Sequence, residues 1–165
     1  MSLNLRELEI SDEAEALAAH AEFPDWDFLI FYTAGMDWAE FVTANKKAAQ
    51  GLDLPKGRVR HTFFIAEVNG VLVGRSSIRH ELNTFLKNYG GHIGYGVRPE
   101  FRGRGYAKEI LRQSLTYIRQ FGVSEVLMTC FDENLASARV IESHGGELEN
   151  VVEFEGKSLR RYWIR

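Results

Sequence analysis

The sequence has few of the features that mark a secreted, disulfide-bonded or membrane-spanning protein. Its 165 residues include one cysteine, Cys130, so no disulfide can form within the chain. No apolar run approaches the ~20 residues that a membrane-spanning helix needs. The segment from Met1 to Glu7 lacks the apolar stretch of a signal peptide. These absences predict a cytoplasmic protein without a membrane partner.

The chain also has few prolines and only a small net charge. Three prolines are scattered along the chain, and the formal net charge is −3 at pH 7. Without an excess of positive charge there is no global attraction to nucleic acid, so a nucleic-acid partner is not expected. The chain does contain 45% hydrophobic residues, enough for one core of ordinary size. We therefore expect a single domain over residues 1–165.

Hydrophobic patterns predict both strands and helices. Asn69-Gly70 lies between two apolar runs, which is the strongest short signal for a β-hairpin. Ser11 is a favourable N-cap for the first helix. The expected strands are 3–10, 62–68, 71–79, 92–97, 126–130, 148–154 and 159–164, and the expected helices are 11–18, 37–50, 106–121 and 135–144, with a loop or short helix over 82–89. This order predicts an α/β fold with a mixed central sheet flanked by helices.

Aromatic residues are concentrated between the first strand and the hairpin. Such a cluster is typical of a core, although it can also line a ligand pocket. Its members are Phe23, Trp26, Phe28, Phe31, Tyr32, Trp38 and Phe41.

The most informative motif follows the strand 92–97. It reads Arg102-Gly103-Arg104-Gly105-Tyr106-Ala107 and leads directly into an amphipathic helix. Glycine lets the backbone approach a ligand closely, and the first N–H groups of a helix lack intrahelical partners. Guanidinium groups match the geometry of phosphate. The motif predicts a phosphate or pyrophosphate site; the alternative is an ordinary turn with solvated arginines.

Two glycines, Gly94 and Gly96, lie on one face of the strand 92–97. Because glycine is a poor strand former, this spacing indicates close approach of a ligand to the backbone. A β-bulge is the alternative interpretation. We favour a ligand groove along Tyr95, Gly96 and Val97.

These motifs resemble the Gcn5-related N-acetyltransferase (GNAT) family. The family signature Gln/Arg-x-x-Gly-x-Gly/Ala matches residues 102–107, and residues 134–146 resemble the family segment Asn-x-x-Ala/Ser with its following helix. The expected order of elements is also that of the GNAT fold. The resemblance implies that residues 102–107 hold the pyrophosphate of acetyl-CoA. It also implies that residues 95–97 pair with pantetheine and that Asn134 faces the pantetheine or acceptor region, although Asn134 is equally a good helix cap.

The chain departs from the family pattern at two catalytic positions. Ile141 replaces the Tyr that protonates the leaving thiolate in many members, and Gly91 stands where some members place a basic Glu. His92, next to Gly91, is the candidate general base, because a histidine with a pKa near ~6.5 accepts protons at neutral pH. His80 and Glu81 are further candidates. Backbone donors with an ordered water are the alternative.

The resemblance implies an acyltransferase that uses acetyl-CoA, needs no metal and acetylates an amine by direct attack in a ternary complex. We expect the amine on a small molecule. Acetylation of a peptide or protein N-terminus and a non-catalytic acyl-CoA-binding module are the alternatives. Arg98, Arg104 and Lys108 are candidates for contact with the 3′-phosphate of CoA. The family also allows a homodimer. Residues 77–83, 90–99 and 161–164 together resemble one branch of the family, which has no established acceptor.

Overall fold

The computed structural model describes residues 2–165, whose strands form two antiparallel sheets. The first sheet has the order β1 (Leu3–Glu7), β2 (His61–Val68), β3 (Val71–Arg79) and β4 (Ile93–Val97). The second has the order β5 (Val126–Phe131), β7 (Lys157–Ile164) and β6 (Glu147–Phe154). The expected mixed α/β architecture is confirmed, and the division into two sheets is a feature that the sequence pattern did not reveal.

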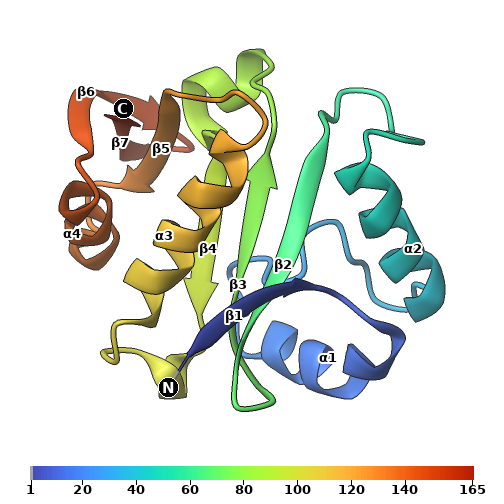
Figure 1. The fold of residues 1–165 in the computed structure, drawn as a ribbon. Coiled ribbons are helices and arrows are strands. Elements are labelled where there is room, and N and C mark those ends of the chain that lie inside the picture. The colour runs from blue at the N-terminus through green and yellow to red at the C-terminus, as the bar shows by residue number, and fades with distance from the viewer. Residues whose placement is uncertain (1) are drawn as a thin grey trace.

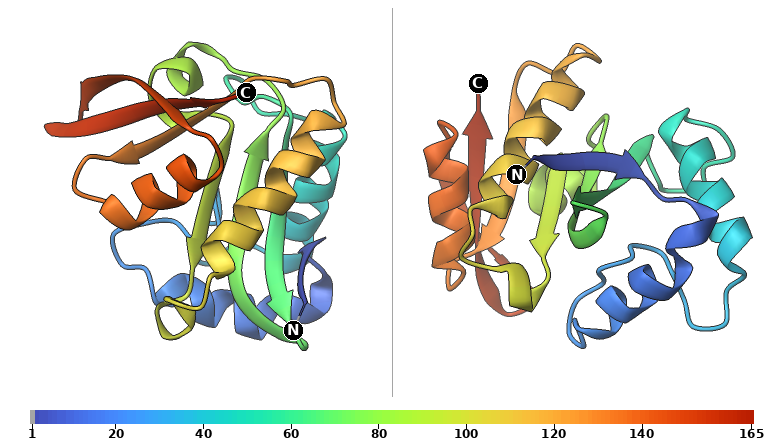
Figure 2. Two further views of the ribbon diagram at one scale, coloured as in Figure 1. Left: turned by 60° about the vertical axis from the view of Figure 1, so that its left-hand side comes forward. Right: turned by 60° about the horizontal axis from the view of Figure 1, so that its bottom comes forward.

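Helices cover both faces of the first sheet (Figures 1 and 2). The helices are α1 (Glu13–Ala21), α2 (Trp38–Ala49), α3 (Tyr106–Arg119) and α4 (Leu135–Ser143), with short helical turns at Ile10–Asp12, Leu86–Gly90 and Pro99–Phe101. None of the helices in the described part of the chain is long and apolar enough to cross a membrane.

The burial of β2 explains how helices come to lie on both faces. Side chains alternate along a strand, so Phe63 and Ile65 pack with α1 and α2, whereas Ala66 packs in the cluster that includes Ile110 of α3. Part of the aromatic cluster belongs to this core, since Phe28 is fully buried. Its outer members lie at the surface, with Trp26 40% exposed and Phe31 43% exposed.

The two sheets meet at one end of β4 and β5. The backbone N–H of His92 donates to the C=O of Leu127 at 2.8 Å, and the Leu127 N–H donates to Nδ1 of the His92 ring at 2.9 Å. Beyond this junction β4 and β5 belong to different sheets. Figure 2 shows the strands of the second sheet leaving the first at a steep angle. The outer edge of β4 therefore has no neighbouring strand among residues 2–165.

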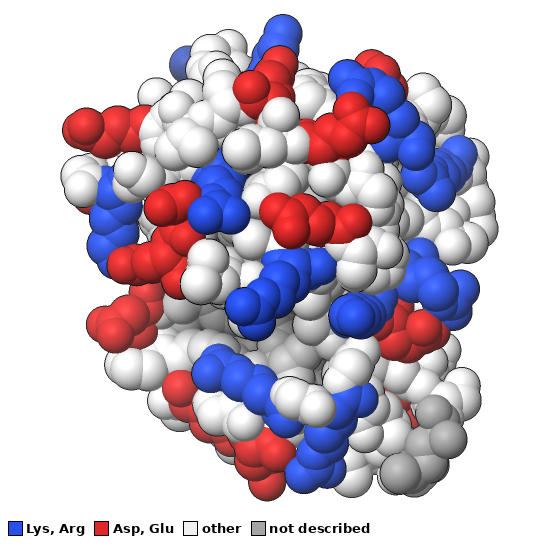
Figure 3. All heavy atoms as spheres, turned by 90° about the vertical axis from the view of Figure 1, so that its left-hand side faces the viewer, with Lys and Arg blue, Asp and Glu red and all other residues white. Residues whose placement is uncertain are grey.

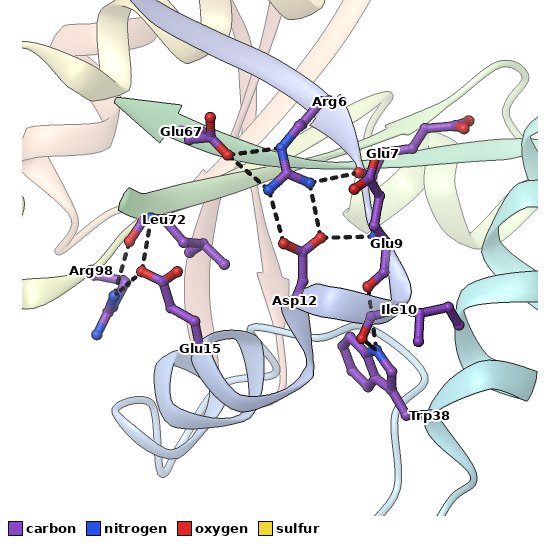
Figure 4. A network of polar contacts seen from close by, with 10 residues as sticks. All are labelled: Arg6, Glu7, Glu9, Ile10, Asp12, Glu15, Trp38, Glu67, Leu72 and Arg98. Carbon is purple, nitrogen blue, oxygen red and sulfur yellow. Dashed lines mark hydrogen bonds and ion pairs between the residues drawn. The ribbon is translucent and has the colours of Figure 1, made fainter. Parts of the chain in front are cut away.

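The start of α1 differs from the expectation. Asp12, not Ser11, precedes the helix, after a 3₁₀ turn. The Asp12 carboxylate accepts the N–H of Glu9 at 2.7 Å and two hydrogen bonds from Arg6 at 2.8 Å each, as Figure 4 shows. Because these contacts fix Asp12 beside β1, the helix begins only after it. The Ser11 prediction is wrong for this reason.

Candidate functional site

The outer edge of β4 directs backbone groups away from the first sheet. The Arg98 N–H donates to the C=O of Val73 on β3 at 2.9 Å. In an antiparallel ladder the hydrogen-bonded residues alternate, so Tyr95 and Val97 direct their N–H and C=O groups to the outer edge. Nε of Arg102 occupies the Val97 C=O at 3.1 Å. The remaining edge groups are free to pair with an amide-bearing ligand, as an added strand would.

The turn after β4 presents a row of unpaired N–H groups. Gly103 and Gly105 have φ values of +76° and +82°, in the left-handed region that favours glycine. The first amide that the helix satisfies is that of Glu109, which donates to the Gly105 C=O at 3.3 Å. The N–H groups of residues 103–108 have no acceptor within residues 2–165. Such a helix start is an anion-binding arrangement.

Arg102 and Arg104 flank these amides. Both side chains are exposed, and neither forms an ion pair with a carboxylate of the described chain. Nη2 of Arg104 donates to the Glu100 C=O at 3.1 Å, which holds the side chain along the turn. Figure 3 shows Lys and Arg side chains around a hollow on this side of the molecule. The turn therefore combines free N–H donors with unpaired positive charge.

Arg98 is not available for a phosphate, so that prediction is wrong. Its side chain is buried and donates to the Glu22 carboxylate at 2.6 and 3.0 Å and to the Leu72 C=O at 2.9 Å. These bonds raise the pKa of Arg98 above its ordinary value. Arg98 instead ties the end of β4 to α1 and β3.

Asn134 and Tyr95, which are far apart in the sequence, meet at Ser137. Oδ1 of Asn134 accepts the Ser137 N–H at 3.1 Å and so caps α4. The Tyr95 hydroxyl lies 2.8 Å from Oγ of Ser137, so its side chain reaches from β4 to α4. Burial raises the pKa of Tyr95 to about 12. These contacts therefore link β4 to the start of α4.

His92 is buried at the junction of the two sheets. Its Nδ1 accepts the Leu127 N–H, so the neutral ring carries its proton on Nε2 and has no free nitrogen that could accept another. Burial, followed by the charge of Arg79, lowers the pKa of His92 to about 4. The imidazole is therefore neutral at physiological pH, but it is a weak base. Its catalytic role stays a prediction.

The other two catalytic candidates lie elsewhere. Nε2 of His80 is 2.8 Å from Oγ1 of Thr62, and its ring packs against Tyr117 and Phe121 at the end of α3. Burial lowers the pKa of His80 to about 4. Glu81 is exposed in the loop that follows. His80 and His92 thus make separate contacts, one to α3 and one to β5.

The two departures from the family pattern have structural reasons. Gly91 has φ +68°, and a Cβ there would lie 2.6 Å from the Leu127 C=O, so the junction excludes a larger residue. Ile141 is fully buried in the core between α3, α4 and the second sheet. Cys130 belongs to the same core, as the sequence predicted, and burial raises the pKa of its thiol to about 11.

Sequence reasoning included Trp26 in the aromatic cluster that can line a pocket, but it missed Arg75 and Arg79, which lie with Trp26 against the face of β4 opposite α3. The ring of Trp26 lies over Gly96, where a Cβ would approach Cη2 to 2.4 Å. Two arginines of β3, Arg75 and Arg79, lie over Gly94. The available signal for the two arginines was their spacing of four residues, which places both on one face of a strand that is otherwise apolar or small.

Comparison with known proteins agrees with this geometry. The family model described as the acetyltransferase (GNAT) domain matches residues 2–147. The uncharacterized N-acetyltransferase YnaD of Bacillus subtilis strain 168 is 26% identical over 133 residues, which cover 75% of this chain and 74% of YnaD.

Two solved structures show the same fold. The putative acetyltransferase yncA of Salmonella typhimurium, solved with its cofactor acetyl-CoA, has 18% identity and a TM-score of 0.67, with 100% of this chain and 94% of that chain covered. Mycobacterium smegmatis RimJ, in complex with CoA-disulfide, has 21% identity and a TM-score of 0.72, with 98% and 81% covered. Since the family model spans most of the sequence, this chain belongs to the GNAT acetyltransferase family.

Proposed function

We propose that the protein transfers the acetyl group of acetyl-CoA to an amine of a small molecule. The observation that carries the proposal is the row of free N–H groups at residues 103–108, beside the unpaired edge of β4. A diphosphate needs many hydrogen-bond donors, and an extended pantetheine arm needs a strand edge. The complex of acetyl-CoA with a protein of the same fold supports this assignment.

The donor is expected to lie between the two sheets. Residues 102–107 would bind its pyrophosphate, with Arg102 and Arg104 supplying charge. The free backbone groups of Tyr95 and Val97 would pair with the pantetheine amides, and Asn134 would face the same arm from α4. Arg104 and exposed Lys108 remain the candidates for the 3′-phosphate.

The chemistry that this arrangement supports is direct acyl transfer. The amine lone pair attacks the thioester carbonyl carbon, a C–N bond forms, and the C–S bond breaks with its electron pair on sulfur. Backbone N–H groups of β4 would stabilise the charge that develops on the carbonyl oxygen. An ordered water held by backbone groups is the proposed acceptor for the amine proton, because the neutral His92 ring has no free nitrogen to accept it. The CoA thiolate leaves without the family Tyr, since a thiol of pKa ~8.5 is a tolerable leaving group.

Titration of the protein with acetyl-CoA, with ATP as the control, tests the donor site. We expect selective binding of acetyl-CoA and its loss in Gly105→Glu, because a carboxylate would then occupy the place of the phosphates. Gly105 has no atom within 4 Å of an added Cβ, so the variant is expected to remain folded apart from strain at its positive φ. Unchanged affinity in the folded variant would contradict the assignment.

Release of free thiol in the presence of amines tests transfer. Binding of acetyl-CoA without thiol release on any amine would favour the non-catalytic binding module. Preference for peptides over free amines would favour the N-terminal acetyltransferase alternative.

A further inference from the structure

Two guanidinium groups converge on one point of β4. A Cβ at Gly94 would lie 3.3 Å from Nη1 of Arg79 and 3.5 Å from Nη1 of Arg75. Both arginines come from β3 and lie on the face opposite α3, because the intervening Ser76 hydrogen-bonds to Ser114 of α3 at 2.8 Å. The absence of a side chain at position 94 leaves room for both groups.

Neither arginine has a carboxylate of residues 2–165 within ion-pair distance, although burial lowers the pKa of Arg75 and the charge of Asp27 partly opposes that fall. Arg75 is 2% exposed, and its Nη1 and Nη2 donate only to the backbone carbonyls of Gly94 and Asp27, at 3.0 and 3.1 Å. Neither arginine takes part in any ion pair formed by residues 2–165.

Each arginine also has a buried N–H group without an acceptor. In the part of the chain that the structure describes, Nε of Arg75 and Nη1 of Arg79 are buried and unpaired. Buried guanidinium groups are normally paired and fully hydrogen-bonded, since an isolated buried charge is costly. Two such groups side by side therefore indicate a ligand that completes the network.

The position of this pair relates it to the proposed reaction. Gly94 precedes Tyr95, whose backbone lies at the edge where the thioester is expected. The Trp26 ring stacks on the Arg75 guanidinium at 4.0 Å and covers Gly96, so it forms a wall of the same region. An anion held at Arg75 and Arg79 would thus lie beside the strand that positions the acetyl group.

A cavity lies beside β2, the strand next to the one that carries the pair. His61 lies opposite Arg79 in the β2–β3 ladder, and it borders this cavity of about 280 Å³. The cavity is lined by apolar side chains, among them Phe31, Met36 and Phe41, and by the charged side chains Glu40, Asp53 and Arg58. A ligand anchored at Arg79 could extend a carbon skeleton into this space.

We propose that the acceptor amine carries a carboxylate, which Arg75 and Arg79 bind. This inference rests on the proposed function. Arg79 is only partly buried, and its guanidinium, supported by the charge of Arg75 beside it, matches the two oxygens of a carboxylate. The same two charges would repel a polyamine or another polycation. The acceptor class is therefore that of amino acids and related amino-carboxylates.

An acceptor panel tests this class by thiol release with acetyl-CoA. The panel holds the standard amino acids, their methyl esters, spermidine and phosphoethanolamine. We expect kcat/KM for the best amino acid to exceed that for its methyl ester at least about tenfold. This ratio corresponds to the loss of one charged hydrogen-bond pair in the ester. Esterification makes the amine less basic and hence less protonated, so chemistry alone would favour the ester.

The matched variants are Arg79→Gln and, as a control, Arg119→Gln on the exposed side of α3. Arg79→Gln is expected to raise KM for the amino acid about tenfold or more. It should leave acetyl-CoA affinity unchanged and should affect kcat/KM for the methyl ester much less than for the amino acid, because the ester has no carboxylate for Arg79 to bind. Arg119→Gln should change none of these. This pattern separates recognition of the carboxylate from a general loss of structure.

Each other outcome has a definite meaning. Equal kcat/KM for acids and esters, or no effect of Arg79→Gln, would overturn the inference while leaving the proposed function intact. Preference for phosphoethanolamine would overturn the carboxylate in favour of a phosphate ester. No transfer to any amine, with acetyl-CoA bound, would contradict the proposed function and this inference with it.

Discussion

Two groups of arginines in this protein differ in how their charge is balanced. Arg6 donates to Asp12 and to Glu67, and Arg98 donates to Glu22, so both are surrounded by carboxylates (Figure 4 shows Arg6 and part of the Arg98 network). These partners raise the pKa of Arg6 and Arg98.

Arg75 and Arg79 show the opposite arrangement. Burial lowers the pKa of both, that of Arg79 to about 10, and no carboxylate of residues 2–165 pairs with either. The first group holds β1, α1 and β3 together. In the described part of the chain, Arg75 and Arg79 form no ion pairs between elements. Arg75 donates only to the backbone C=O groups of Gly94 and Asp27. The difference indicates that the arginines paired with carboxylates stabilise the fold, whereas Arg75 and Arg79 are available to bind a ligand.

The largest expected effect is at Arg98. Arg98→Met removes two hydrogen bonds to Glu22 and one to Leu72, and is expected to lower the free energy of unfolding by about 3 kcal/mol. Chemical denaturation measures this loss. A free energy of unfolding equal to that of the wild type would show that the ion pairs of Arg98 do not stabilise the fold. It would contradict the distinction between the two groups of arginines.

The next largest effect is the contribution of His92 to the pH dependence of stability. Like Arg6 and Arg98, His92 makes polar contacts that connect elements of the fold. Its folded pKa of about 4 lies below the ordinary value of 6.5, so the unfolded chain binds the proton first. Stability is complete above pH 6.5 and falls as the pH decreases toward 4, by roughly 2–3 kcal/mol. Unfolding curves at several pH values measure the slope, to which His80 contributes in the same direction.

His92→Asn separates the structural from the catalytic role of this residue. Its amide oxygen can accept the Leu127 N–H in place of Nδ1, while the titrating ring is lost. We expect a smaller pH slope of stability and an unchanged kcat, because the neutral ring has no free nitrogen that could accept the amine proton. A lower kcat with unchanged acetyl-CoA affinity would contradict this expectation. An unchanged kcat in this folded variant would remove His92 from the mechanism.

The smallest effect is at Arg79. Arg79→Met is expected to raise the free energy of unfolding by about 1 kcal/mol, since a buried unpaired charge is replaced by an apolar side chain of similar length. The measurement is the same denaturation experiment. A loss comparable to that of Arg98→Met would place Arg79 in the structural group, against the comparison.

Local sequence signals predicted much of the fold. Asn69 and Gly70 have φ values of +51° and +78°, as a tight hairpin between β2 and β3 requires. The cap at Asn134 and the start of α3 after Gly105 also follow from neighbouring residues. The Ser11 prediction failed because Asp12 is held by Arg6, six residues earlier and on another element.

The sequence by itself determined the residues of the proposed phosphate turn, because positive φ and a helix start depend on adjacent positions. Only the tertiary structure decided that Arg98 pairs with Glu22, that Tyr95 meets Ser137, and that Arg75 and Arg79 converge on Gly94. These contacts arise from strand pairing and from the junction at His92. Burial and charge balance there depend on residues that are distant along the chain, so no local pattern reveals them.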